Sequence, residues 1–393
     1  MHTRGMRRSA VAALAAMSVA CTSGATVPAG SSGASTTVVS AAELPAPLEE
    51  LLAVAADRQW FTHGDDTFDV WICHVPLDST ASMYAGTPLR LALTPADVAE
   101  VLNRQVTPYY DTLSHGLYHP VFNAGGEVQM AVADEPQACL DEAIAEAGAG
   151  TNAVFAVADA DHGSSDPGGF GSVGEPCAVV VVCAVGATNR SAYIGAADFH
   201  AEWGDQQPMD LAEHEVGHTL GWMHSGVEDR GGYLSALDVM SNSAAPRDVD
   251  ATRRDGPDTL ALNRLLAGWL PRSAVWNAPT ARGTVTLAPS MSAAGTRVAV
   301  VAIDDNHFLT IELLTADGFN DHLPADGIAV HRVEVSGGVV QNSAPLVGEA
   351  PYADLLQVGA SLTAGGWRIT VDAGGGDGPD AAWTVTILPS VEP

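Results

Sequence analysis

The sequence predicts an α/β domain with a mixed sheet over residues 65–272, followed by an all-β domain over residues 273–393. Two observations lead to this fold class. Up to about residue 225, strand-like and helix-like segments alternate, which is typical of a layered α/β domain. After about residue 275, short apolar segments are separated by Gly, Pro, Asn and Asp without any helical periodicity, which is typical of a β module.

The first residues predict an exported chain. Three arginines precede an apolar stretch that ends at Ala20 and is too short for a membrane span of about 20 residues. This order is typical of a signal peptide, here residues 1–20. Cys21 follows, and Cys-Thr-Ser-Gly resembles the start of a mature bacterial lipoprotein, although Ser18 stands where that motif prefers Leu or Val. We expect either a secreted chain or one anchored to the cell surface through a lipid on Cys21.

The charge of the chain excludes two classes of partner. Its 393 residues include 47 acidic and 17 basic residues, the basic ones all Arg, and the formal net charge is −30. Such a polyanion repels phosphate backbones, so nucleic-acid binding is excluded, and anionic membrane surfaces repel it as well. We therefore expect membrane contact only through a lipid on Cys21, and we expect a monomer.

Residues 21–64 are expected to form a tether rich in Ser, Gly, Ala and Pro, with a short helix at 48–58. In the α/β domain, Thr94 is expected to cap a helix, and a run of valines at 179–182 predicts a buried strand. The expected strands of this domain are 67–72, 127–132, 153–158 and 179–182, and its expected helices are 94–106, 134–147 and 209–220. The expected strands of the β domain are 284–287, 298–303, 308–313, 328–335, 367–371 and 383–388.

The cysteines suggest two disulfides. Without Cys21 four remain, and an even number in an exported chain favours pairing over the alternative of four buried thiols. The valine-rich segment between Cys177 and Cys183 should be extended, which separates their Cα atoms by roughly 20 Å, whereas a disulfide tolerates at most about 7 Å. Two connectivities remain: Cys73–Cys177 with Cys139–Cys183, or Cys73–Cys183 with Cys139–Cys177.

One segment carries the strongest chemical signal: His-Glu-Val-Gly-His-Thr-Leu-Gly-Trp-Met-His. His214 and His218 are four residues apart and project from one face of a helix, so both imidazoles can reach one metal ion. Glu215 lies about 100° round the helix, where its carboxylate can approach a water at the metal without being a ligand. His224 can join them only if the helix ends first, and Gly221 is the residue expected to end it in the left-handed conformation.

Three neutral histidines with one position left open for water are typical of a catalytic zinc site rather than a structural one. The alternative is a helix with metal-free histidines, and buried ring nitrogens would then need other partners. The motif therefore predicts one catalytic Zn²⁺ held by His214, His218 and His224.

This pattern resembles the metzincin metallopeptidases, whose motif is HExxHxxGxxH followed by a Met-turn. Asp238-Val239-Met240-Ser241 is the best candidate for that turn, in which Met240 would form an apolar floor beneath the ligands. Ser225 after the third histidine is similar to matrixins and gametolysin-like enzymes. The tyrosine ligand of astacins and serralysins has no counterpart two residues past Met240. Tyr233 either reaches the oxyanion or is a solvent-facing loop residue.

Two downstream segments resemble immune inhibitor A-type secreted metallopeptidases. Residues 260–270 are similar to their helix followed by Leu-Gly-Trp-Leu, and residues 308–330 to part of their β module. The usual Arg two residues after Glu312 is Leu314 here, so an ion pair made by that Arg is not expected.

The resemblance implies a metzincin-like catalytic domain and a zinc-dependent endopeptidase that hydrolyses protein or peptide substrates. A zinc-activated water would attack the peptide bond, with Glu215 as general base. Two alternatives remain. The β module could make the chain a surface binding protein with a relic peptidase domain, although Glu215 is intact. The motif also permits a zinc hydrolase that acts on other substrates.

A Gly-rich loop carries Asp159, Asp161 and Asp166 together with His162. Carboxylates and backbone carbonyls of such a loop can bind Ca²⁺. The alternatives are a solvated acidic turn and, through His162, a structural zinc site like that of matrixins.

Overall fold

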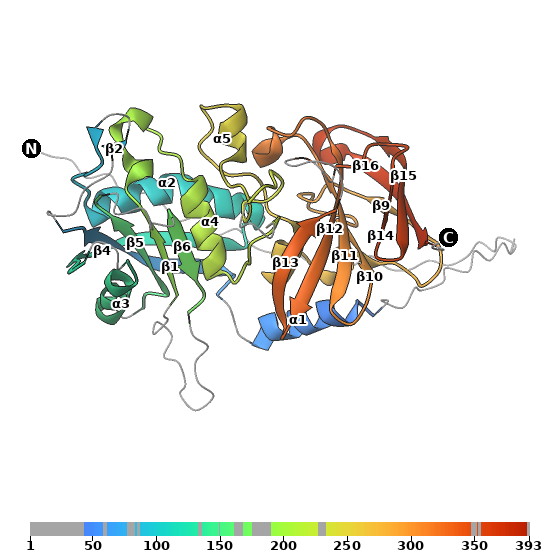
Figure 1. Ribbon diagram of the computed structural model, residues 1–393, viewed down its shortest axis with the longest axis horizontal. Helices are drawn as coiled ribbons and strands as arrows, with labels where there is room; N and C mark the ends of the chain where they lie inside the picture. Colours follow the sequence, from blue (N-terminus) through green and yellow to red (C-terminus); the bar gives the residue numbers. More distant parts are fainter. Residues whose placement is uncertain are drawn as a thin grey trace, which may run out of the picture. The chain divides into compact units, whose positions relative to one another are not determined.

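The computed structural model describes residues 43–57, 61–76, 83–84, 87–132, 136–148, 150–160, 168–174, 190–226, 233–346, 352 and 355–390. They belong to a compact unit, Ala42–Pro393. This unit is mixed α/β, with a mixed sheet first and antiparallel β-structure towards the C-terminus, as expected (Figure 1). The predicted signal peptide, Cys21 and most of the predicted tether lie outside the described residues. No helix within these ranges is both long enough and apolar enough to cross a membrane.

The first sheet has the order β4-β1-β5-β7-β6. Its first four strands run parallel, and β6 runs antiparallel to β7. The strands are β1 (Gly64–His74), β4 (Tyr118–Gln129), β5 (Ala153–Ala158), β6 (Gly169–Ser172) and β7 (Ser191–Ile194). A separate pair consists of β2 (Met83–Tyr84) and β3 (Thr87–Pro88).

Helices cover both faces of this sheet. Alternate side chains of a strand point to opposite faces, and here apolar side chains lie on both faces. Phe68 of β1 and Phe155 of β5 share a core with α2 (Pro95–Leu113) and α4 (Asp210–Thr219). On the other face, Trp71 and Ala156 pack with α3 (Pro136–Glu146). This three-layer arrangement places α4, which carries the histidine motif, directly on the sheet.

The strand expected at 127–132 is confirmed only for residues 127–129, which end a longer strand, β4, that begins at Tyr118. Pro120 and two glycines interrupt its local pattern, so sequence periodicity does not reveal it. The glycines have a packing role, since a Cβ at Gly126 would lie 2.5 Å from the Trp71 ring. Their place opposite a register shift in β1 explains how they fit within a strand.

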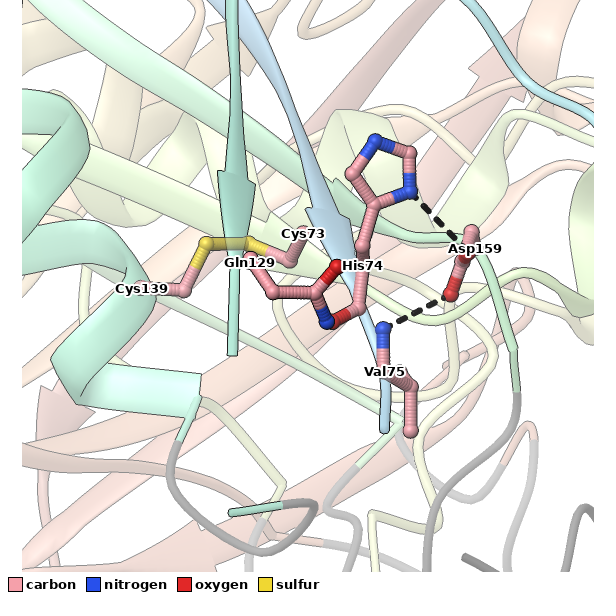
Figure 2. The surroundings of a disulfide bond; sticks show 6 residues. All are labelled: Cys73, His74, Val75, Gln129, Cys139 and Asp159. Atoms are coloured by element: carbon pink, nitrogen blue, oxygen red, sulfur yellow. Dashed lines mark hydrogen bonds and ion pairs between the residues drawn. A yellow bond between two sulfur atoms is a disulfide. The ribbon is translucent and has the colours of Figure 1, made fainter. Parts of the chain in front are cut away.

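The disulfide prediction is wrong, because Cys73 is bonded to Cys139 (Figure 2). Cys73 points from β1 towards the face that α3 covers, and Cys139 is a buried residue of α3. This bond excludes both expected connectivities, which had joined each of these cysteines to Cys177 or Cys183. Sequence spacing cannot show that α3 packs over the end of β1. Cys177, Cys183 and the valine run between them lie outside the described residues.

Non-reducing peptide mapping should therefore recover two peptides joined through Cys73 and Cys139. Replacing both cysteines by Ala should lower the free energy of unfolding by about 2–4 kcal/mol, because the bond joins residues 66 apart in sequence. Recovery of Cys73 linked to Cys177 or Cys183 would contradict this pairing.

The C-terminal part contains two sheets that share a core. One has the order β13-β12-β11-β10-β8 and is antiparallel except that β8 runs parallel to β10; the other has the order β14-β15-β16-β9 and is antiparallel. The strands are β8 (Val275–Asn277), β9 (Gly283–Leu287), β10 (Val298–Ala302), β11 (His307–Leu314), β12 (Gly327–Ser336), β13 (Val339–Pro345), β14 (Ser361–Ala364), β15 (Trp367–Gly375) and β16 (Ala382–Pro389). All six strands expected from the sequence are found, and β8, β13 and β14 are additional.

The outer face of the five-stranded sheet is covered by helices from outside residues 273–393. Helix α1 (Ala46–Asp57) contacts β11 and β13 (Figure 1), and α1 and α6 (Ala261–Leu266) share one core with apolar residues of this sheet, such as Phe308. The expected short helix at 48–58 is therefore not part of a free tether. The domain boundary at residue 272 stays a prediction, and a fragment that tests it has to include both helices to keep this face covered.

Helix α6 is also joined to β11 by a buried carboxylate. Glu312 accepts hydrogen bonds from the backbone N–H of Ala261, the nearer at 3.0 Å, and burial raises its pKa to about 7 despite the nearby Arg264 guanidinium. Arg264 donates to buried Asp258 at 2.9 Å. The cation near Glu312 is thus Arg264 of α6. Position 314 of β11, where the resemblance implies an Arg, is occupied by Leu.

The remaining helical segments are short. They are η1 (Ala197–Phe199), η2 (Ala201–Trp203), α5 (Ala245–Val249), η3 (Arg272–Ala274), η4 (Gly318–Asn320) and η5 (Gly378–Asp380).

Candidate metal centre

Helix α4 carries the first two histidines of the motif. It spans Asp210–Thr219, close to the expected 209–220, so His214 and His218 project from adjacent turns of one face. Their Nε2 atoms lie 3.2 Å apart. The helix thus brings two ligand atoms together without any loop.

The chain reverses directly after α4. Gly221 has a φ of 83°, and its N–H donates to the His218 carbonyl at 3.0 Å, while the N–H of Trp222 donates to the Gly217 carbonyl at 3.2 Å. These two bonds form a Schellman motif, which needs a left-handed residue at this position. The reversal brings His224 back, with its Nε2 2.9 Å from that of His218 and 3.2 Å from that of His214.

A buried ion pair holds the C-terminal end of α4 against the sheet. Arg190 donates to both carboxylate oxygens of Asp66, at 3.0 and 2.8 Å, and to the carbonyl of Thr219, at 3.0 Å. Asp66 is fully buried and Arg190 nearly so, so loss of either partner would leave a buried charge uncompensated. Sequence reasoning missed this pair, because no local pattern links Asp66 of β1 to Arg190, which lies 124 residues later and directly before β7.

The other ring nitrogen of each histidine has an acceptor. His214 Nδ1 donates to the Val239 carbonyl at 2.7 Å, and His218 Nδ1 donates to the Trp222 carbonyl at 2.8 Å. His224 Nδ1 lies 3.3 Å from the hydroxyl oxygen of Tyr233. Protons on the three Nδ1 atoms leave the Nε2 lone pairs free to face one another, which is the tautomer of metal-bound histidine.

Electrostatics favour neutral imidazoles. Burial lowers the pKa of His214 to about 4, and burial together with the other two histidines lowers that of His218 to about 3. Burial also lowers the pKa of His224. Neutral rings are the form that binds metal.

The three Nε2 atoms fit a tetrahedral metal ion. Zinc–nitrogen bonds of about 2.0–2.1 Å place two ligand nitrogens roughly 3.3 Å apart, and the observed separations are 2.9–3.2 Å. Among the described residues, this is the one group of three or more His, Cys, Asp or Glu placed to hold a metal. Imidazole nitrogen suits zinc and other transition metals, so the geometry supports a transition-metal site.

Met240 lies beneath helix α4. It is fully buried, and a Cβ at Gly217 would lie 2.5 Å from its sulfur. The close contact explains why the residue before His218 is glycine. This is the position that the resemblance implies for the Met of a Met-turn, and the functional role of Met240 stays a prediction.

The segment around Met240 also fixes the third histidine. The Met240 carbonyl accepts a hydrogen bond from the N–H of Ser225 at 3.1 Å. The Ser225 hydroxyl donates to Asp238 at 2.5 Å, and the Asp238 carboxylate is completely buried. Because Ser225 follows His224, these bonds hold His224 against the turn that supports His214. The sequence had suggested Ser225 only as a point of resemblance, and Asp238 only as part of the turn.

Glu215 lies under the edge strand β6. Its carboxylate is buried, and its Oε2 has no hydrogen-bond partner among the described residues. A Cβ at Gly169 would lie 2.6 Å from the other carboxylate oxygen, so β6 approaches this closely only because it has glycine there. Burial raises the pKa of Glu215 to about 8, and a nearby bound cation would act in the opposite direction.

These groups share one cavity of about 640 Å³. Its lining includes the three histidines, Glu215, Tyr233 and strand β6. The structure therefore brings all the predicted ligands and the predicted base to one cleft.

The sequence left two interpretations of Tyr233 open, a residue that reaches the oxyanion or a solvent-facing loop residue. In the structure Tyr233 lines the cavity of the histidines. Its ring centroid is 4.6 Å from that of His224, and the residue is 44% exposed. Replacing Tyr233 by Phe removes the acceptor of His224 Nδ1–H, so metal affinity should fall by about 10–100-fold. Competition with a chromophoric chelator measures this change. Tyr352→Phe, in the β part and outside the cavity, is the control, and equal affinities for both variants would contradict the role.

Of the residues suggested for a Ca²⁺ site, the structure describes only Asp159. The Asp159 carboxylate accepts from the N–H of Val75 at 2.9 Å and pairs with His74 at 3.1 Å (Figure 2). It also lies 3.4 Å from the Arg90 guanidinium. Both its oxygens are thus engaged by protein groups. Asp161, His162 and Asp166 lie outside the described residues.

No family model matches this chain, and no curated protein matches it significantly.

Proposed function

We propose that this chain is a zinc-dependent endopeptidase with a metzincin-like catalytic domain. The observation that carries the proposal is the convergence of three Nε2 atoms beside a buried carboxylate in one cleft. The reversal at Gly221 and the place of Met240 beneath α4 support the metzincin-like arrangement. We also propose export, with a lipid on Cys21 as the candidate anchor, from the N-terminal sequence.

His214, His218 and His224 would hold the ion. Zinc at this position would lower the pKa of a coordinated water and polarise the scissile carbonyl as a Lewis acid. Glu215 takes a proton from the attacking water and delivers it to the leaving amine. The Glu215 carboxylate is buried, so bulk water has little access to it. Its Oε2 accepts no hydrogen bond from the described part of the chain and is free to accept one from a water molecule.

The edge of the sheet supports a peptide as the substrate. In the described residues, β6 pairs with β7 on one side and is the edge strand of its sheet. Gly169 and Ser172 at the ends of β6 both line the cleft of the histidines. An open strand edge offers backbone N–H and C=O groups to an extended peptide. A hydrolase for small non-peptide substrates would need no such edge.

The test is hydrolysis of casein by the purified chain, with metal analysis, before and after treatment with a chelator. We expect about one zinc per chain, cleavage, and loss of cleavage on chelation that zinc reverses. Bound zinc without cleavage of any protein would favour a hydrolase of other substrates. A chain with neither zinc nor cleavage would favour a binding protein.

A further inference from the structure

Part of the catalytic cleft is formed by residues from outside the predicted catalytic domain. Leu51 of α1, together with Val339 and Val340 of β13, lines the same cavity as His214 and Glu215. Leu266 of α6 lies beside them in this lining. We call Leu51, Leu266, Val339 and Val340 the aliphatic wall.

The aliphatic wall is held rigidly. Leu51, Leu266 and Val340 belong to the core that joins both helices to the five-stranded sheet, and they are 3%, 9% and 7% exposed. Val339 is half-buried and is therefore the member that a ligand can reach most easily. Packed residues of this kind present a preformed surface rather than an adaptable one.

A tight turn places Val339 in the cleft. Gly337 and Gly338, which connect β12 to β13, have φ values of 60° and 69°, as the centre of a type I′ hairpin turn requires. The turn rests on α1, where a Cβ at Gly338 would lie 2.4 Å from Val54. Helix α1 is tied in turn by Glu49, which accepts two hydrogen bonds from Arg272 at 2.9 and 2.6 Å.

The cleft has a polar part around the histidines and an apolar part at the aliphatic wall. All charged or titratable side chains of its lining, as far as the chain is described, belong to the metal centre: His214, Glu215, His218, His224 and Tyr233. The aliphatic wall has no polar side chain. An apolar side chain gains from burial there, whereas a charged one would lose its hydration without a partner.

We propose that the aliphatic wall binds a large apolar side chain of the peptide substrate beside the scissile bond. The chain would thus prefer peptides with an aliphatic or aromatic residue at that position, and three of the four wall residues, all except Leu266, lie outside the predicted catalytic domain. This inference rests on the peptidase function proposed above and adds the substrate class. Continuity of the wall with the histidines and Glu215 in one cavity identifies a substrate, rather than another partner, as the occupant.

The test uses the full zinc-loaded chain and fluorogenic peptides that differ at one position next to the cleaved bond, carrying Ala, Leu, Phe, Asp or Arg. For the wild type, kcat/KM should be about 10–100-fold higher with Leu or Phe than with Ala. Val339→Asp should bring the Leu-to-Ala ratio close to 1 and raise cleavage of the Arg peptide. Val339→Thr, which keeps the size, should give an intermediate ratio. Val358→Asp, at a valine that is 51% exposed and outside the cleft, is the matched control and should leave the ratio unchanged.

The outcomes separate the two proposals. A wild-type ratio near 1, or a ratio that Val339→Asp and Val339→Thr leave unchanged while zinc content and Tm are retained, would overturn the role of the wall. Failure of the zinc-loaded wild type to cleave casein or any of the peptides would instead overturn the peptidase proposal. Calorimetry of Leu and Ala peptides with Glu215→Ala then tests the wall without turnover, and equal affinities would refute it.

Discussion

Replacing Glu215 by Ala should lower kcat for peptide hydrolysis by about 10³-fold or more, while the chain keeps about one zinc. In the proposed mechanism Glu215 accepts the proton, and its carboxylate is buried in the cleft beside the histidines. It is not one of the three converging ligands, so its loss should not release the metal. Initial-rate assays with a fluorogenic peptide measure kcat, and metal analysis of the same sample measures the zinc content.

The control for this variant is Glu202→Gln, which changes an exposed glutamate on η2. It should retain the wild-type kcat. Full activity of Glu215→Ala would remove the base from the proposed mechanism, and loss of its zinc would show that the carboxylate helps to hold the ion.

Replacing His218 by Ala should abolish both zinc retention and hydrolysis. His218 lies close to both other histidines of the proposed ligand set, since its Nε2 lies 3.2 Å from that of His214 and 2.9 Å from that of His224. Two remaining imidazoles cannot complete the three-ligand set of a catalytic zinc site. Metal content after gel filtration and residual kcat measure the effect.

A matched histidine variant distinguishes this effect from a general one. His307→Ala changes a partly exposed histidine of β11 that pairs with Asp304 at 2.8 Å, and it should keep both zinc and activity. A His218→Ala chain that still binds one zinc with wild-type affinity would contradict the proposed ligand set.

The convergence of the three histidines could be predicted from the sequence because its geometry is mostly local. Four residues separate His214 from His218 on one helix, and Gly221 reverses the chain within the next turn. Helical spacing and the left-handed preference of glycine are sufficient to bring His224 back. The expected strand 153–158 likewise matches β5, since its continuous apolar pattern reflects burial on both faces.

Contacts between distant segments could not be predicted in this way. The Cys73–Cys139 bond depends on which face of the sheet α3 covers, and the predicted pairings failed for that reason. The expected tether helix packs on the C-terminal sheet because Leu51 and its neighbours complete an apolar core there. Asp66 of β1 and Arg190, the residue before β7, form their buried pair across a long sequence separation. Each of these depends on tertiary packing, which leaves no periodic signal in the sequence.

The most direct test of the account is a zinc titration of the metal-free chain, followed by the rate of peptide hydrolysis. The chain would be stripped with a chelator, dialysed, and supplied with zinc in steps while a fluorogenic peptide reports activity. The account predicts no hydrolysis without metal and a rate that rises linearly to a plateau at about one zinc per chain. Hydrolysis by the metal-free wild type, or an inactive chain at one bound zinc, would contradict it.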